Sequence, residues 1–353
     1  MRKTIIFSTV LLWVGVTGSV EGGFIFGTPT NLGPVVNTVG SDGSPDISAD
    51  GLTLYFDSLR AAGLGSWDIW MTSRETTDGE WSPPTLLPAP VNGGYSDSGP
   101  SISADGLSLY FASDRPGGYG SPDIYVAKRE TADDPWGIPE NLGRTVNSSS
   151  YDNHPSISSD GLMLFFGSAR GGGYDLYVTQ RATTDSEWTV PVSLGMTTNT
   201  IYNELSPDIS SDGLSVFFDR RGASGDRDLW VAARDPRSDG PTAAMNLGTP
   251  INTWYEDTDP SISADGCTLY FGSTRPGGAG GQDLWQVSVA PVRVMPDLNG
   301  DGVVNLLDLA EIASHWLKDD PSTDIAPAPY GDGIVDYKDL AGLSEYWLTY
   351  PGQ

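Results

Sequence analysis

The sequence repeats one pattern five times, and this repeat constrains the possible folds more than any other feature. The first copy reads SPDISADGLTLYFDS from Ser44, and the last reads DPSISADGCTLYFGS from Asp259. Successive copies begin 55, 55, 52 and 53 residues apart, measured between Pro45, Pro100, Pro155, Pro207 and Pro260. A chain built in this way is expected to fold as a series of similar units, each packed on its neighbours.

Each copy carries two further signatures. A motif of the WDIW type follows it, with its aspartate at Asp68, Asp123, Asp175, Asp228 or Asp283. An asparagine stands eight residues before each proline, at Asn37, Asn92, Asn147, Asn199 and Asn252. The repeated unit therefore extends from the asparagine through the WDIW-type motif.

Each unit is predicted to form four strands. A short strand such as DIS is followed by an Asp-Gly turn, which is a strong hairpin signal, and by an apolar strand such as LTLYF. A glycine-rich loop leads to a third strand such as DIWMTSR, and a linker leads to a fourth around W..P..LG. Four strands per period of about 50 residues favour an all-β, five-bladed β-propeller over residues 24–290, with a linear solenoid as the alternative.

The segment FGTPTNLG, from Phe26 to Gly33, is expected to close the ring. It matches the fourth-strand segments of the inner units, whereas the fifth unit ends at DLWQVSVAPV without supplying one. We therefore expect Thr28–Leu32 to pair with the sheet that carries Leu284, because closure removes the two free sheet edges of an open array.

The repeat SPDISADGLTLYFDS…WDIW resembles the WD40-like repeat of the Pro-Asp type found in TolB-like propellers, over about residues 26–290. The resemblance implies the propeller fold, and because such folds carry many functions it implies no activity.

One face of such a propeller would carry the links between blades together with the loops between second and third strands, and we call it the link face. Each link contains an acid five residues after its asparagine: Asp42, Asp97, Asp152, Glu204 and Asp257. These acids are candidates for a ligand-binding or cation-binding mouth. Alternatively, they pair with the arginines that end each second strand, at Arg60, Arg115, Arg170, Arg220 or Arg221, and Arg275.

Link residues that differ between units are the better candidates for specificity. They are Tyr95, Tyr151, His154, Tyr202, Trp254, Tyr255 and Glu256. Aromatic rings beside carboxylates suit stacking on sugars or gripping a peptide, although they could equally pack between blades. We expect a binding protein for a protein or carbohydrate ligand, without catalytic residues. The alternative is a glycoside hydrolase or lyase acting on polysaccharide, although the acids expected near the axis mostly repeat and no serine-hydrolase or zinc-protease motif is present.

After a linker at 291–296, the segment DLNGDGVVNLLD fits a calcium-binding loop. Its ligands would be Asp297, Asn299, Asp301, Asn305 and Asp308 with the carbonyl of Val303. The following LLDLAEIASHWL has helical spacing, and a half-copy follows, YGDGIVDYKDLAGLSEYWL. The Asp-Leu-Ala segments of the two copies begin 31 residues apart, at Asp308 and Asp339. Two loop–helix units of this kind resemble a type I dockerin, over 297–350.

That resemblance implies Ca²⁺-dependent folding and docking onto a cohesin-like partner. The recognition positions would be Leu306, Leu307, Tyr337 and Lys338. The second loop departs from the family pattern, because Ala328 and Tyr330 stand where acids belong. We expect Asp324 to substitute for them, in a site made of Asp324, Asp332, Asp336, Asp339 and the carbonyl of Ile334. The alternative is a calcium-stabilised tail without a cohesin partner.

The amino terminus has the features of a secretory signal peptide over residues 1–22. Arg2 and Lys3 precede thirteen mostly apolar residues and then a run of small ones, although an uncleaved anchor is an alternative. We therefore expect an exported protein. A net charge of −27 argues against nucleic-acid partners, and one cysteine excludes an internal disulfide.

Overall fold

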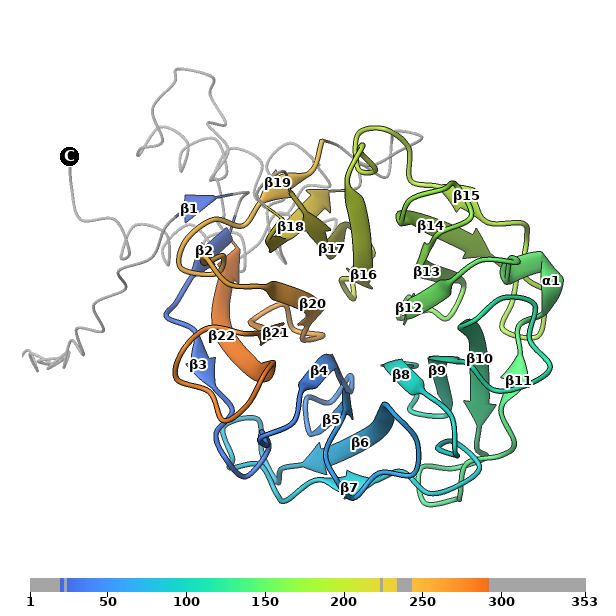
Figure 1. Cartoon of the computed structure of the whole chain (residues 1–353), viewed down its shortest axis with the longest axis horizontal. Helices are drawn as coiled ribbons and strands as arrows, with labels where there is room; N and C mark the ends of the chain where they lie inside the picture. Colours follow the sequence, from blue (N-terminus) through green and yellow to red (C-terminus); the bar gives the residue numbers. More distant parts are fainter. Residues whose placement is uncertain (1–19, 22–23, 223–224, 234–242, 292–353) are drawn as a thin grey trace, which may run out of the picture. The chain divides into compact units, whose positions relative to one another are not determined.

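A computed structural model describes residues 20–21, 24–222, 225–233 and 243–291. The chain divides into two units, Met1–Ala290 and Pro291–Gln353, and the description below concerns the first. Its strands form five sheets placed around one central axis, as Figure 1 shows. The predicted all-β, five-bladed propeller is therefore confirmed.

The first four blades have four strands each, and in all four the strands follow one another in chain order from the axis outward. Blade 1 consists of β4 (Asp42–Ile47), β5 (Thr53–Ser58), β6 (Asp68–Ser73) and β7 (Thr85–Leu86). Blade 2 consists of β8 (Asp97–Ile102), β9 (Ser108–Ser113), β10 (Asp123–Lys128) and β11 (Glu140–Asn141). A single helical turn, α1 (Gly143–Val146), follows it.

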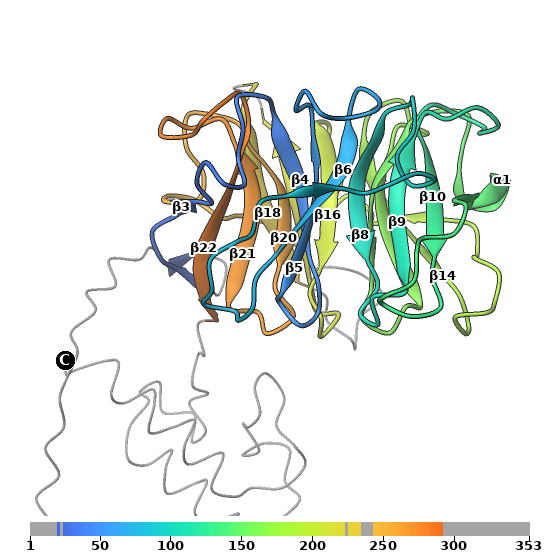
Figure 2. The same cartoon turned by 90° about the horizontal axis from the view of Figure 1, so that it is seen from below.

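Blade 3 consists of β12 (Asp152–Ile157), β13 (Met163–Ser168), β14 (Asp175–Gln180) and β15 (Val192–Ser193). Blade 4 consists of β16 (Asn203–Ile209), β17 (Ser215–Arg221), β18 (Arg227–Ala233) and β19 (Met245–Asn246). Blade 5 combines β20 (Asp257–Ile262), β21 (Thr268–Ser273) and β22 (Asp283–Pro291) with three amino-terminal strands, β1 (Val20–Glu21), β2 (Phe24–Phe26) and β3 (Thr30–Asn31). Neighbouring strands within each blade are antiparallel, and they run along the axis in Figure 2.

The amino-terminal segment closes the ring as the sequence predicts. In β3, Asn31 pairs with Trp285, and the Leu32 N–H donates to the Leu284 carbonyl at 3.0 Å. The contact extends further than predicted, because β2 also lies beside β22 and Gly27 donates to the Ser288 carbonyl at 3.0 Å.

The innermost strands are longer than the predicted three residues because each contains a bulge. In blade 1 the register shifts between Gly43 and Asp46, and Pro45 lies inside that shift. A proline cannot donate to a strand ladder, so it is tolerated where the bulge leaves it unpaired. The strand therefore begins at Asp42, four residues before the predicted start at Asp46.

Hydrogen bonds also join the five innermost strands to one another around the axis. The residue after each repeated proline accepts from a backbone N–H of the next blade. The donor–acceptor pairs are Ile102–Asp46, Ile157–Ser101, Ile209–Ser156, Ile262–Asp208 and Ile47–Ser261. The last pair joins blade 5 to blade 1, so this ring is closed.

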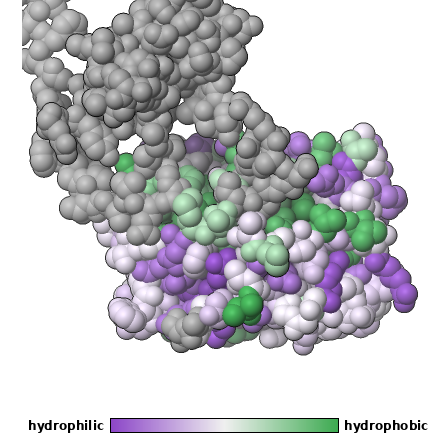
Figure 3. Space-filling view, turned by 90° about the horizontal axis from the view of Figure 1, so that it is seen from above, coloured by the Kyte–Doolittle hydropathy of each residue, from purple (hydrophilic) through white to green (hydrophobic). Residues whose placement is uncertain are grey.

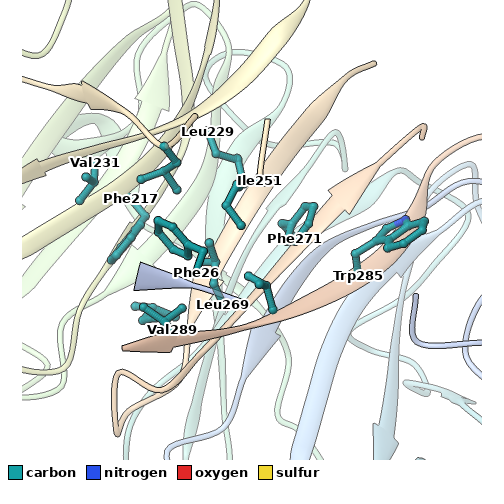
Figure 4. Packing of buried hydrophobic residues seen from close by; sticks show 12 residues of the cluster. Phe26, Phe217, Leu229, Val231, Ile251, Leu269, Phe271, Trp285 and Val289 are labelled. Carbon is teal, nitrogen blue, oxygen red and sulfur yellow. The ribbon is translucent and has the colours of Figure 1, made fainter. Parts of the chain in front are cut away.

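Apolar residues pack in the seams between blades. In the seam between blades 5 and 1, Arg74 stacks on Trp81 and donates to the Tyr270 hydroxyl at 3.0 Å. The seam between blades 4 and 5 differs, since Phe217 occupies the tyrosine position and Phe24 lies 5.5 Å from its ring. Figure 4 shows Phe26 buried beside Phe217 in this cluster. The amino terminus therefore supplies both a closing strand and part of a core.

Candidate functional site

The repeated asparagines fasten each link to the preceding blade. Asn37 donates to the Leu284 carbonyl and accepts from the Leu284 N–H, at 3.0 and 2.8 Å. The other four make the same pair of bonds to Ile69, Ile124, Leu176 and Leu229. Since they are buried and satisfied within the propeller, these asparagines position the link face without facing a ligand.

The five repeated acids of the links are fully buried and ion-paired. Asp42, for example, accepts from Arg60 at 2.6 Å, from Ser58 at 2.5 Å and from the Thr38 N–H at 2.6 Å. The other pairs span 2.6 to 2.8 Å and are Asp97–Arg115, Asp152–Arg170, Glu204–Arg220 and Asp257–Arg275. Of the two roles that the sequence allows, the geometry shows the ion pair. It also shows that Arg220 is the partner of Glu204, whereas Arg221 pairs with Glu256.

A ring of five residues, one from each blade, borders a small hollow on the axis. They are the residues before the repeated prolines: Ser44, Gly99, His154, Ser206 and Asp259. All five have a positive φ, between 46° and 58°. The four with side chains adopt a conformation that is strained in that region, and strain of this kind is often retained at functional sites.

His154 needs the glycine beside it. A Cβ added to Gly99 would lie 3.1 Å from the His154 Cα and 3.3 Å from its Cδ2. The hollow that remains has a free volume of about 20 Å³, which is enough for water. Asp46, Asp208 and the repeated prolines complete its lining.

An unrepeated charged cluster surrounds this hollow. The His154 Nε2 lies 3.7 Å from Asp259 Oδ1, and Ser206 donates to the same oxygen at 2.6 Å. Gln282 donates to Asp259 Oδ2 at 2.9 Å. Nearby, Arg227 contacts Asp219 Oδ2 through Nε at 2.7 Å and a terminal nitrogen at 2.5 Å. These groups come from blades 3, 4 and 5, and we call them, with Asp46, Asp57 and Asp208, the axial cluster.

Burial and neighbouring charges give these carboxyls different pKa values. Burial raises the pKa of Asp208 to about 7, against the hydrogen bonds from Ile262 and Ser156. Burial and the charge of Asp259 raise the pKa of Asp57 to about 7. Burial opposes ionisation of Asp259 as well, but the charges of His154 and Arg227 outweigh it and lower its pKa. Burial and the charge of Asp208 also raise the pKa of Asp46. The hollow is therefore bordered by two carboxyls with raised pKa values, Asp46 and Asp208, and by one with a lowered pKa, Asp259.

The predicted aromatic residues of the links are exposed. Tyr95, Tyr151, Tyr202 and Tyr255 keep between 38% and 52% of their surface, and Trp254 keeps 92%. Glu256 is half-exposed and pairs with Arg221 at 3.0 Å. His154 differs from the other candidates, because burial in the axial ring lowers its pKa.

Sequence reasoning missed most of the axial cluster. It expected the link acids to lie at the axis. The structure places other acids there: Asp259, two residues after a link acid, and Asp46 and Asp208, each four residues after one. Asp57 and Asp219 of the axial cluster lie in second strands. A usable signal was present: Asp57 and Asp219 occupy a position filled by Ala112, Gly167 and Gly272 in the other blades. A charged residue that breaks an apolar or small-residue column of a repeat is a candidate functional residue.

The predicted calcium and cohesin-binding residues, from Asp297 to Asp339, lie outside the described residues. So do residues 1–19 of the predicted signal peptide, whereas Val20 and Glu21 form β1. Within the described ranges no cluster of acids, histidine and cysteine is arranged to hold a metal ion. No helix among those residues has the length and apolar character needed to cross a bilayer.

No protein-family model and no curated protein matches the sequence. Solved structures do resemble it in fold. The α-L-arabinofuranosidase PaAbf62A of Podospora anserina, in complex with cellotriose, is 12% identical, with a TM-score of 0.51 over 75% of this chain and 98% of that one. The catalytic domain of a GH62 α-L-arabinofuranosidase from Coprinopsis cinerea is 14% identical, with a TM-score of 0.50 over 74% and 97%. TolB from Agrobacterium tumefaciens is 19% identical, with a TM-score of 0.46 over 72% and 79%.

These structures correct one expectation. The sequence reading expected no enzyme, partly because unrepeated axial acids were counted as few. The arabinofuranosidases share the propeller fold, and the axis of this chain carries several unrepeated carboxyls. At 12 to 14% identity the likeness concerns the fold alone, and activity must be argued from the site.

Proposed function

We propose that this protein is a carbohydrate-active enzyme that hydrolyses glycosidic bonds of a polysaccharide bound on the link face. The observation that carries the proposal is a pair of carboxyls among the three that border the axial hollow. Asp208, with a pKa of about 7, and Asp259, with a lowered pKa, lie on neighbouring innermost strands. Two carboxyls whose environments separate their pKa values in this way suit general acid and general base roles.

In the proposed reaction, ionised Asp259 removes a proton from a water molecule whose oxygen attacks the anomeric carbon. Asp208 donates its proton to the glycosidic oxygen as the bond from the anomeric carbon to that oxygen breaks. Both carboxyls then return to their starting states by proton exchange with solvent. Arg227 and Ser206 keep Asp259 ionised and oriented.

The test is an incubation of the full chain with a panel of plant and microbial polysaccharides, followed by chromatography of released sugars. We expect release from at least one substrate, and a loss of at least 100-fold in Asp259→Asn, the order expected when one general acid–base residue is removed. Asp78→Asn, on an exposed loop, is the matched control. An Asp259→Asn variant with full activity, or a folded wild type inactive on the whole panel, would reject the proposal.

The proposal extends to the carboxy-terminal unit and to export. We propose that residues 297–350 bind Ca²⁺ through the two loops and attach the propeller to a cohesin-like protein, outside the cytoplasm. The support is the spacing of hard oxygen side chains from Asp297 to Asp308. Calcium added to the metal-stripped full chain should raise helix content, and Asp301→Ala should weaken this response. An unchanged spectrum in the wild type would reject the calcium assignment.

A further inference from the structure

The tips of the five links can be compared position by position because the links share one set of hydrogen bonds. In each, the residue after the asparagine donates its N–H to the buried link acid, as in Thr38–Asp42 and Thr253–Asp257. The next residue forms the tip: Val39, Gly94, Ser149, Ile201 and Trp254. Trp254 is the one aromatic residue at this position, so the other four tips serve as controls for it.

Trp254 is held in place while its ring faces water. The hydroxyl of Thr253 accepts from the Tyr255 N–H at 3.2 Å, and Thr274 accepts from the Glu256 N–H at 3.1 Å. Trp254 nevertheless keeps 92% of its surface exposed. A large ring held by an ordered backbone loses little further entropy on binding, which favours it as a contact surface for a ligand.

The Trp254 tip is continuous with the axial cluster. Glu256 pairs with Arg221 of blade 4. The negative charges of Glu256 and Asp259 both act to raise the pKa of Arg227. The chain passes from Trp254 to Asp259 in five residues. A ligand that covers Trp254 and Tyr255 would therefore extend toward the hollow.

We propose that Trp254 and Tyr255 form a sugar-stacking subsite that selects a neutral polysaccharide and directs it toward the axial cluster. The inference rests on the proposed function and adds its substrate class. Aromatic faces stack on the apolar face of a pyranose or furanose ring, while Glu256 and Arg221 can bond its hydroxyls. Glu256 and Arg221 neutralise one another, and the net charge of −27 disfavours a polyuronate.

The tip is not the only apolar surface of the propeller. Figure 3 shows one flank, on whose visible part hydrophobic residues form separate groups among hydrophilic ones. Exposed apolar residues scattered in this way are ordinary for a folded protein. What distinguishes Trp254 is its place beside the unrepeated charges, not its exposure.

The experiment measures binding and hydrolysis separately. Native gel electrophoresis of the full chain in gels containing neutral arabinoxylan, neutral β-glucan or polygalacturonate gives apparent Kd values, and Asp259→Asn prevents turnover during the run. In that background we expect Trp254→Ala to weaken binding of a neutral polymer about tenfold. Trp254→Phe should keep most of the affinity. Val39→Ala, which removes an equally exposed tip from another link, should leave the Kd unchanged.

The outcomes separate the two proposals. Unchanged affinity in Trp254→Ala, or tighter binding of polygalacturonate than of both neutral polymers, overturns the subsite. A Val39→Ala loss equal to that of Trp254→Ala overturns it as well. If the wild type hydrolyses a polysaccharide while Trp254→Ala keeps its KM, the proposed function stands and the subsite fails. If Asp259→Asn binds a neutral polymer through Trp254 while the wild type releases no sugar, the subsite stands and the hydrolytic function fails.

Discussion

Asn37 and Leu284 lie 247 positions apart in the sequence and exchange two hydrogen bonds, at 3.0 and 2.8 Å. The same pair of bonds recurs in four other links, where the two blades are also joined directly by the chain. Between blades 5 and 1 the chain does not run directly from β22 to β4, so the amino-terminal segment joins them together with the Ile47–Ser261 and Arg74–Tyr270 hydrogen bonds. This asymmetry makes the seam between blades 5 and 1 a sensitive test of the closed ring.

We predict that Asn37→Ala lowers the free energy of unfolding by about 1–3 kcal/mol, because it leaves buried backbone groups of Leu284 without partners. Asn92→Ala removes the equivalent bonds to Ile69 and is the matched control. Hydrogen exchange of β3 and β22 should rise in Asn37→Ala and stay unchanged in Asn92→Ala. Equal exchange of β3 in the two variants would contradict the special role of this seam.

We predict that Phe26→Ala costs about 3–5 kcal/mol, since Phe26 is fully buried in the seam between blades 4 and 5. Val35→Ala, at a half-exposed position of the same amino-terminal segment, should change stability by less than about 1 kcal/mol. Urea unfolding followed by tryptophan fluorescence measures both. A loss below about 1 kcal/mol in Phe26→Ala would show that β2 does not contribute to the core.

We predict that breaking a buried ion pair costs more stability than breaking an exposed one, and two arginines allow the comparison. Arg115→Met should cost about 3–5 kcal/mol because it leaves the fully buried Asp97 without its charge partner. Arg221→Met removes an exposed pair with Glu256 and should cost no more than about 1 kcal/mol. Thermal unfolding of the two variants measures the loss of stability in each. Similar losses would mean that the link acids are not held by their arginines.

Stability should fall as the pH rises from about 4 to 7. The pKa of Asp208 is about 7 in the folded state, above the value of roughly 3.9 expected when unfolded, so the folded state binds more protons in this window. Each pKa unit corresponds to about 1.4 kcal/mol. Asp208→Asn cannot ionise, so urea unfolding at several pH values should show a smaller decline. An identical pH dependence in the variant and the wild type would refute the assignment, and Asp78→Asn serves as control.

The repeat made the fold predictable, because five copies of one strand pattern leave few ways to bury their apolar faces. The closing strand was predictable for the same reason, since the fifth unit lacks a fourth strand. The role of β2 was harder to foresee. It depends on Phe217 replacing the tyrosine that pairs with an arginine in other seams, which matters only once the blades are adjacent.

The site was predictable in part. The sequence identified the link acids and their arginines but could not decide whether they face a ligand or one another, because that depends on burial. His154 and Trp254 were recognised as unrepeated residues. Asp46 and Asp208 were missed because they lie within the repeated motif, and their proximity depends on the positive-φ bulge that precedes them.

The pH dependence of kcat/KM on the best polysaccharide tests the central claim most directly, because it reports the acid and base of the free enzyme. With Asp208 as general acid at a pKa of about 7, the rate should fall about tenfold per pH unit above pH 7, and Asp208→Asn should lose most activity without losing its fold. A rate that stays constant from pH 6 to 9, or an Asp208→Asn variant with the wild-type profile, would contradict the assignment of the axial carboxyls as the hydrolytic centre.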